Sequence, residues 1–263
     1  MIMARLLASG VVFLAVSVVS AGHAGQAGAW REEKSTHFIV YYNNAPEDFI
    51  RKLVENAEYD YDKIAGDLGF NRKDFWLWDE RAEVYVYDNA DAYHSDTGQP
   101  AWTGGDALPG RKIIRTYVYA QGFTETTLPH ELSHIIFREF VGFYNPAVPR
   151  WLDEGVAQYQ EKGRVAGAKP LIQSAMNNGS FIPLSELENL GPQLMFSEAA
   201  AGLFYAESAG IVDFLIGEYG PDAFVTFCQN LRDKKNLQRA VSSAYPFSTI
   251  VEFNAAWEKY IKK

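Results

Sequence analysis

The chain has 263 residues, of which 48% are hydrophobic, 14% aromatic and 22% charged, and this composition excludes a disordered, collagen-like or coiled-coil protein. The net charge is -9 and no cluster of five or more Lys and Arg occurs, so nucleic acid and anionic membranes are not expected partners. The single cysteine, Cys228, excludes an internal disulfide and a cysteine-rich metal site. Any metal must therefore be held by histidine and carboxylate side chains.

Residues 1–24 have the layout of a secretory signal peptide. Arg5 precedes an apolar run over 6–19, and small residues follow it up to Ala24. The run is short for a membrane span, which needs about 20 apolar residues, so we expect cleavage after Ala24 or a nearby alanine rather than an uncleaved anchor. Cleavage there removes one arginine and no acid, which changes the net charge from -9 to -10. The sequence predicts an exported protein, periplasmic or secreted, with no stable membrane span after cleavage.

The first half of the remaining chain alternates strand and helix patterns. Apolar residues at helical spacing predict a helix over 46–68, which ends at Gly69. Residues 94–111 are rich in glycine and proline and predict a loop. Runs of β-branched and aromatic residues predict strands at 37–42, 83–87 and 113–119.

The second half of the chain has a helical pattern. The segment 163–196 contains several glycines and prolines, so we expect a long loop that contains one short helix near 185–187 and covers a cleft. A small mixed sheet with a helix, followed by a helical half, predicts the α+β class in one domain over 25–263. The predicted helices lie at 125–141, 150–161, 197–219, 221–232 and 248–261.

The main chemical signal is the sequence H-E-L-S-H at 130–134. On a helix, positions i and i+4 lie on one face, so the imidazoles of His130 and His134 can face a single ion. Glu131 is rotated by about 100° from His130, which suits a base acting on metal-bound water rather than a ligand. The alternative is a pair of core histidines that are bonded to backbone carbonyls or tyrosine hydroxyls.

A catalytic zinc needs a third protein ligand and one open position. Glu154 follows His134 by 20 positions and opens the next predicted helix, which allows a helix, a turn and an antiparallel return. Asp153 is the competing ligand, on a face of the helix about 100° away. The alternative role for Glu154 is that of a solvated first-turn acid that complements the helix dipole.

The motif at 130–134, followed by W-L-D-E-G at 151–155, resembles the gluzincin zinc metallopeptidases, which include thermolysin and the zinc aminopeptidases. The chain is most similar to the small bacterial peptidase MA-like domains. Weaker similarity at 59–69, 181–187 and 205–220 extends the resemblance over most of 35–220. The resemblance implies a zincin-like fold and a Zn2+ ion held by His130, His134 and Glu154.

The resemblance also implies a mechanism. Glu131 would take a proton from a zinc-bound water that attacks a peptide carbonyl, and would pass it to the leaving amine. The family has a Tyr or His on a later helix that stabilises the oxyanion. No histidine follows His134, so Tyr205 is the predicted stabiliser, and ordinary core packing is its alternative role.

The sequence departs from the family's pattern at two places. Thermolysin-type enzymes carry an acid four residues after the metal-binding Glu as a partner for a ligand histidine, but that position is Gln158 here. Asp153 or a backbone carbonyl is then expected to orient the imidazoles. The acidic motif with which zinc aminopeptidases hold a free amine has no match at 102–106, which favours cleavage of internal peptide bonds.

Gly104 and Gly105 are predicted substrate-binding residues. They lie in a loop that leads to the strand before the catalytic helix, where an extended peptide could add to the sheet edge by backbone hydrogen bonds. The alternative is a turn-rich connector without a binding role.

Three functional hypotheses follow. The first is an exported zinc metallopeptidase that acts on a peptide or protein substrate. The presence of Glu131 and of a complete set of metal-ligand candidates favours it. The second is a catalytically idle relative that binds a peptide, an envelope component or a partner protein. The third is a zinc hydrolase that acts on a non-peptide amide. The sequence predicts no oligomeric state.

Overall fold

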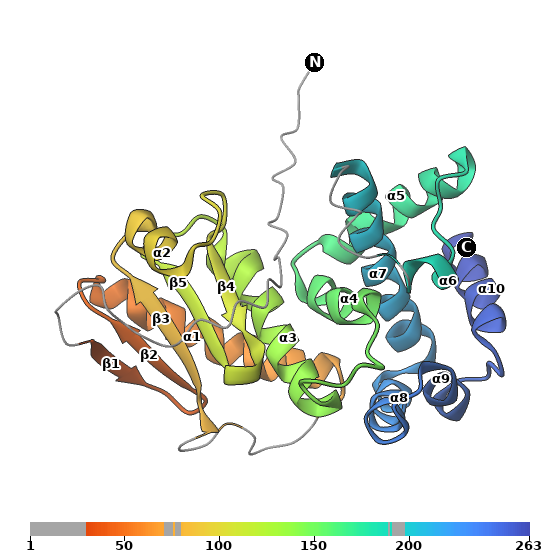
Figure 1. Ribbon diagram of the computed structural model, residues 1–263, viewed down its shortest axis with the longest axis horizontal. Coiled ribbons are helices and arrows are strands. Elements are labelled where there is room, and N and C mark those ends of the chain that lie inside the picture. The colour runs from red at the N-terminus through yellow and green to blue at the C-terminus, as the bar shows by residue number, and fades with distance from the viewer. Residues whose placement is uncertain (1–29, 71–75, 77–79, 189, 191–197) are drawn as a thin grey trace. The chain divides into compact units, whose positions relative to one another are not determined.

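The computed structural model describes residues 30–70, 76, 80–188, 190 and 198–263 (Figure 1). The predicted signal peptide, residues 1–24, lies outside these described residues. The chain divides into two compact units. Unit 1 comprises the described residues up to 58 and from 76 to 128, and unit 2 the others. Unit 1 holds the sheet and unit 2 is helical, so the α+β class is confirmed. The domain limits 25–263 stay a prediction.

Within the described residues, unit 1 contains a five-stranded sheet with the order β1-β2-β3-β5-β4. The central strands β2, β3 and β5 are parallel, and each edge strand is antiparallel to its neighbour. Buried and half-buried side chains alternate along β2 and β3, the pattern of a sheet with one face in the core. The strands are β1 (Arg31–Lys34), β2 (Phe38–Tyr42), β3 (Ala82–Tyr87), β4 (Gly105–Leu108) and β5 (Ile113–Tyr117).

The helix α1 (Glu47–Asp67) matches its prediction, and its first half belongs to unit 1, where it buries Ile50, Leu53 and Ala57. This first half runs behind the sheet in Figure 1. The loop predicted over 94–111 is wrong at both of its ends. It contains the end of α2 (Ala90–Thr97) and all of β4.

Glycines explain the error in this segment. The Asn89 side chain caps α2 by accepting the Ala92 N–H at 2.9 Å, and Gly98 ends the helix with a left-handed φ of 68°. Gly105 is the first residue of β4, and glycine is required there because a Cβ would lie 2.7 Å from the Phe123 ring. The glycines at 98 and 105 therefore mark a helix end and a tightly packed strand.

Unit 2 consists of helices, and the predicted ones at 125–141, 150–161, 197–219, 221–232 and 248–261 are present with small shifts of their ends. A wider turn, Phe123–Thr127, precedes the first of them. The short helix near 185–187 is also present. The helices are α3 (Leu128–Val141), α4 (Arg150–Gln160), α5 (Arg164–Asn178), α6 (Leu184–Leu187), α7 (Glu198–Tyr219), α8 (Pro221–Lys234), α9 (Leu237–Ala244) and α10 (Ile250–Ile261).

The helix α7 is central to unit 2. It packs against α4, α5, α8 and α10. Its stretch Ala199–Tyr219 is long and apolar enough, by length and composition, to cross a membrane, but 67% of its most apolar window is buried inside the protein. This burial is what a core helix requires, because a helix that is apolar on all sides must be covered on all sides.

The prediction that 163–196 is mostly loop is wrong, because α5 occupies much of it. Gly163 and Gly179 have left-handed φ angles of 76° and 79° and bound the helix at its two ends. Pro170 lies inside α5, where its side chain is exposed. The glycines are therefore helix boundaries. Residues 191–197 of the predicted loop lie outside the described residues.

Gly155 allows α4 to approach α7 closely. A Cβ at this position would collide with the Ser208 carbonyl group and lie 3.0 Å from Val212 Cγ2. We expect Gly155→Ala to lower the free energy of unfolding by roughly 1–3 kcal/mol, because backbone cannot move aside as a flexible side chain does. Thermal denaturation followed by circular dichroism measures this change.

The matched control is Gly167→Ala. Gly167 is exposed on α5, and no atom lies within 4 Å of the position of an added Cβ. Alanine there should raise stability by about 0.5–1 kcal/mol, because it restricts the unfolded chain. Equal effects of the two substitutions would show that α4 and α7 do not pack through Gly155.

Glu207 is a buried carboxyl on α7. Its Oε1 accepts the Ile182 N–H at 3.0 Å, and its Oε2 has no hydrogen-bond partner within the described part of the chain. Burial raises its pKa to about 8, although the Ile182 N–H opposes this shift. A raised folded-state pKa stabilises the fold below the ordinary pKa of about 4.5, and this contribution is lost as the pH rises toward 8.

We therefore expect Glu207→Gln to raise the melting temperature more at pH 8 than at pH 5. Glutamine keeps the acceptor for Ile182 and removes the charge that forms at high pH. Melting curves of both proteins across this pH range measure the difference. The control is Glu186→Gln at an exposed position, which should give the same small change at both pH values. A pH-independent difference for Glu207→Gln would contradict the burial argument.

Candidate metal centre

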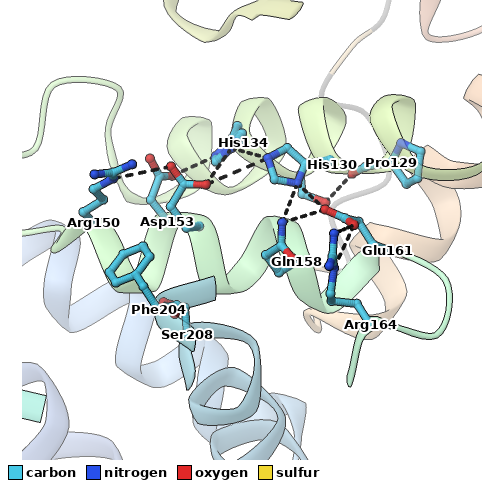
Figure 2. A network of polar contacts seen from close by, with 12 residues as sticks. Pro129, His130, His134, Arg150, Asp153, Gln158, Glu161, Arg164, Phe204 and Ser208 are labelled. Carbon is cyan, nitrogen blue, oxygen red and sulfur yellow. Dashed lines mark hydrogen bonds and ion pairs between the residues drawn. The ribbon is translucent and has the colours of Figure 1, made fainter. Parts of the chain in front are cut away.

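Two histidines on successive turns of α3 point toward each other. His130 Nε2 and His134 Nε2 are 3.2 Å apart, and the ring centroids are 4.8 Å apart (Figure 2). Their side chains are only 10% and 11% exposed. The i, i+4 spacing on a helix produces this arrangement, because both side chains lie on one face. Leu132, Ile135 and Phe137 on the same helix are also buried, so the pair lies in the body of unit 2.

Glu154 on α4 is the third member of the group. Its Oε2 lies 3.9 Å from His130 Nε2 and 4.0 Å from His134 Nε2. Zinc ligands at about 2.0–2.1 Å in tetrahedral geometry are roughly 3.3 Å from one another, so the two nitrogens already have this spacing and Glu154 needs a small movement. Among the His, Cys, Asp and Glu side chains of the described residues, these three form the group whose donor atoms converge, all within 4.8 Å of one another.

The donor set fits zinc. Two imidazole nitrogens and one carboxylate oxygen are the ligands of the two-His-one-Glu catalytic sites and leave a fourth position open. Each histidine also has its other nitrogen beside a carboxylate, so neither Nε2 needs to carry a proton. A divalent ion is the partner that satisfies both nitrogens and the carboxylate together.

Asp153 lies beside His134 and not among the converging donors. Its Oδ1 is 3.3 Å from His134 Nδ1, and Arg138 Nη2 donates to its Oδ2 at 2.8 Å. Burial alone would lower the pKa of His134, but the negative charges of Asp153, Glu154 and Glu131 raise it to about 9. Burial raises the pKa of Asp153, and the charges of His134 and Arg138 outweigh it and lower that pKa to about 2. Of its two predicted roles, Asp153 has the geometry of the orienting partner.

Sequence reasoning missed Glu161, which lies at the end of α4. Its Oε1 is 2.8 Å from His130 Nδ1, and its side chain is only 4% exposed. Burial raises the pKa of Glu161, but His130 and Arg164 outweigh this effect and lower it below the ordinary value. The sequence carries one signal for it, because on the predicted helix 150–161 a residue seven positions after Glu154 falls on the same side of the helix.

The other carboxylate oxygen of Glu154 faces Arg150. Glu154 Oε1 is 3.7 Å from Arg150 Nε, and the Arg150 guanidinium lies 5.3 Å from the centre of the Phe204 ring. Burial and the charge of Glu154 raise the pKa of Tyr205 to about 12, against the opposing effect of Arg150. The Tyr205 hydroxyl therefore lies within electrostatic range of Glu154, and it is protonated at neutral pH.

Glu131 is buried on α3 between the two histidines in sequence, with 3% of its surface exposed. Its charge contributes to the raised pKa of His134, so the carboxylate lies within electrostatic range of the same site. It is not one of the three converging donors. This is the placement that the sequence predicts for a base rather than a ligand.

Gly104 and Gly105 lie in unit 1, and both are in contact with other residues of that unit. The Thr116 hydroxyl donates to the Gly104 carbonyl at 2.7 Å, and a Cβ at Gly105 would lie 2.8 Å from the Arg115 carbonyl oxygen as well as against Phe123. Packing inside the unit accounts for glycine at position 105. The substrate-binding role of both residues stays a prediction.

Comparisons with known proteins agree with this geometry. A model of the Peptidase MA superfamily matches residues 78–263. Among solved structures, the chain is similar to an M1 zinc metallopeptidase variant from Deinococcus radiodurans, with a TM-score of 0.52 and 15% sequence identity. No curated protein sequence matches the chain.

The structural similarity covers 88% of this chain and 52% of the Deinococcus protein, so the chain spans about half of that protein's length. At this identity the likeness concerns the fold, and it confirms the predicted zincin-like fold. The match to the family model covers most of the chain and includes all three converging side chains. The chain therefore belongs to the Peptidase MA superfamily.

Proposed function

We propose that the protein is an exported, zinc-dependent metallopeptidase that hydrolyses internal peptide bonds of a peptide or protein. The observation that carries the proposal is the convergence of His130, His134 and Glu154 in a buried site that lies within electrostatic range of the buried Glu131. Membership of the Peptidase MA superfamily supports the same reaction class.

In this proposal each residue has one role. Bound zinc would polarise the scissile carbonyl and make water a better nucleophile at neutral pH. His130, His134 and Glu154 would hold the ion, and Glu131 would accept a proton from the attacking water and later deliver it to the leaving amine. The burial of Glu131 keeps bulk water away from this proton transfer.

Tyr205 is the proposed oxyanion stabiliser. Its raised pKa keeps the hydroxyl protonated at neutral pH, so it can donate a hydrogen bond to the negative oxygen that develops in the transition state. The charge of Glu154 acts on this hydroxyl, which supports a position beside the reacting carbonyl.

The finer parts of the proposal come from the sequence. The signal-peptide pattern at 1–24 supports export to the periplasm or the medium. The absence of an amine-binding acidic motif at 102–106 supports cleavage of internal bonds. A catalytically idle, metal-containing binding module of the cell envelope is the second candidate, and the presence of Glu131 beside a complete ligand set weighs against it.

Metal analysis of the purified protein tests the ligand set. We expect about one zinc per chain in the wild type and in Glu131→Gln, because Glu131 is not a ligand. His134→Ala should lose most of the zinc, because it removes one of three protein ligands. Zinc-free protein in every case, after purification in the presence of zinc, would rule out a zinc protein.

Peptide cleavage tests the role of Glu131. The wild type and Glu131→Gln are each loaded with zinc and incubated with a mixed peptide library, with and without a chelator, and the products are analysed by mass spectrometry. We expect wild-type cleavage at internal bonds, its loss with chelator, and a rate for Glu131→Gln that is lower by about 100-fold to 10,000-fold. Zinc-loaded wild type that cleaves nothing would instead favour the binding module.

Tyr205→Phe tests the oxyanion role. We expect kcat to fall by about 100-fold to 1,000-fold while zinc content and KM change little, because the hydroxyl acts on charge that develops in the transition state. Tyr159→Phe is the control, since this tyrosine lies on α4 but outside the converging group. Burial and the charges of Asp213 and Asp67, rather than that of Glu154, raise the pKa of its hydroxyl. An unchanged kcat in Tyr205→Phe would leave Tyr205 as a packing residue.

A further inference from the structure

The acid that thermolysin-type enzymes use as the partner of a ligand histidine is missing from its usual position in this chain. The acid expected four residues after the metal-binding glutamate is replaced by Gln158. An amide is a weaker acceptor than a carboxylate and carries no charge to strengthen the imidazole as a ligand. A buried carboxylate nevertheless lies at the imidazole, and it comes from a different position.

We propose that Glu161 is the positioning residue for His130, and that Gln158 and Arg164 hold Glu161 in place. Through its hydrogen bond to Nδ1, Glu161 fixes the imidazole in the tautomer whose Nε2 is free to bind a metal. The inference rests on the proposed function, because it assigns a metal ligand to His130.

The hydrogen bonds of Glu161 account for both of its oxygens (Figure 2). Oε1 accepts from Gln158 Nε2 at 2.7 Å and lies 2.8 Å from His130 Nδ1. Oε2 accepts from Arg164 Nε at 3.0 Å and from Arg164 Nη2 at 2.7 Å. A buried carboxylate with this many donors is ionised and fixed in orientation.

An ionised carboxylate can only accept, so His130 Nδ1 must be the donor in this contact. A neutral imidazole that donates from Nδ1 has its lone pair on Nε2, the atom that lies 3.2 Å from His134 Nε2. Gln158 Nε2 is 3.4 Å from the same Nδ1, but two donors do not bond to each other, so the Gln158 amide acts on Glu161. The tautomer of His130 therefore follows from Glu161.

The helix ends at which Glu161 and Arg164 lie do not favour their charges, so the contact with His130 is the reason that remains for them. Glu161 ends α4 with an extended backbone, and Arg164 begins α5. A negative charge at a helix C-terminus and a positive charge at a helix N-terminus both oppose the helix dipoles. Their mutual ion pair, at 2.7 Å, and the contact with His130 compensate this cost.

A purely structural role makes a different prediction. In that case Glu161 would serve to join the end of α4 to the start of α5 through Arg164. Loss of the carboxylate would then lower thermal stability but leave the metal affinity of the folded protein unchanged. Metal affinity and the His130 tautomer therefore separate the two roles.

The experiment compares the wild type with Glu161→Gln, Glu161→Asp and the double variant Gln158→Glu with Glu161→Gln. The double variant returns the acid to the position that it has in thermolysin-type enzymes, at constant net charge. Zinc affinity is measured by competition with a chromophoric chelator, cobalt(II) absorption reports ligand geometry, and 15N chemical shifts of the histidine rings report the tautomer. Melting curves identify any variant that does not fold.

We expect zinc to bind about 10-fold to 100-fold more weakly to Glu161→Gln, which is the usual effect of losing a partner of a metal-binding histidine. The Nδ1–H tautomer of His130 should lose population in this variant. Glu161→Asp keeps the charge on a shorter arm and should lose less affinity, and the double variant should recover part of it.

Glu58→Gln is the matched control. Glu58 Oε2 lies 2.5 Å from His37 Nδ1, so this substitution breaks a similar carboxylate–histidine pair outside the converging group. Its zinc affinity should equal that of the wild type.

The outcomes distinguish the inference from the proposed function. Wild type that binds no zinc would overturn both. Wild type and Glu161→Gln with equal zinc affinity and the same His130 tautomer would overturn the role of Glu161 alone. If Glu161→Gln does not fold, the same comparison is made with Glu161→Asp, and wild-type affinity in that variant would also overturn it.

Discussion

The site depends on the burial of two imidazoles whose Nε2 atoms lie 3.2 Å apart. Neither nitrogen can be left without a partner in the body of unit 2, because an unpaired buried polar group costs about 1–3 kcal/mol. The surrounding charges follow from this constraint. Each Nδ1 lies beside a carboxylate, Asp153 or Glu161, and each of these carboxylates is paired with an arginine. Charge alternates outward from the two histidines, so the buried charges of Asp153 and Glu161 each have an opposite charge beside them.

The position of Glu154, the third of the converging side chains, depends on backbone packing. Gly155 brings α4 against the carbonyl group of Ser208 on α7, and Glu154 is its immediate neighbour in the chain. The same contact fixes Tyr205, which lies one turn before Ser208 on α7. A glutamate and a tyrosine on two helices are thus positioned by one close approach. Groups held on packed helices keep their geometry better than groups on loops.

Periodicity predicted the helices that carry the converging side chains, and the H-E-x-x-H spacing predicted the histidine pair because the geometry of a helix alone produces it. Features that depend on tertiary contacts were not predictable. The strand β1 has four exposed side chains and no alternation, and it forms only by pairing with β2. The helix α5 was not predicted because Gly163 and Gly179, which lie at its two ends, made the segment resemble a loop. Glu161 was missed because its partner lies 31 positions earlier in the chain.

Gln158 taken alone would count against a functional metal centre, since thermolysin-type enzymes have an acid at this position. The physical requirement is an acceptor at Nδ1 of His130, and a fixed offset along α4 is only one way to provide it. A residue at the end of α4 can meet it, because the extended backbone at Glu161 is not constrained to the helical direction and the start of α5 supplies a cation. The glutamine then acts as a donor to the displaced acid. A departure from a motif is therefore better judged by which atom it leaves without a partner, and here each ring nitrogen of His130 and His134 has a polar neighbour.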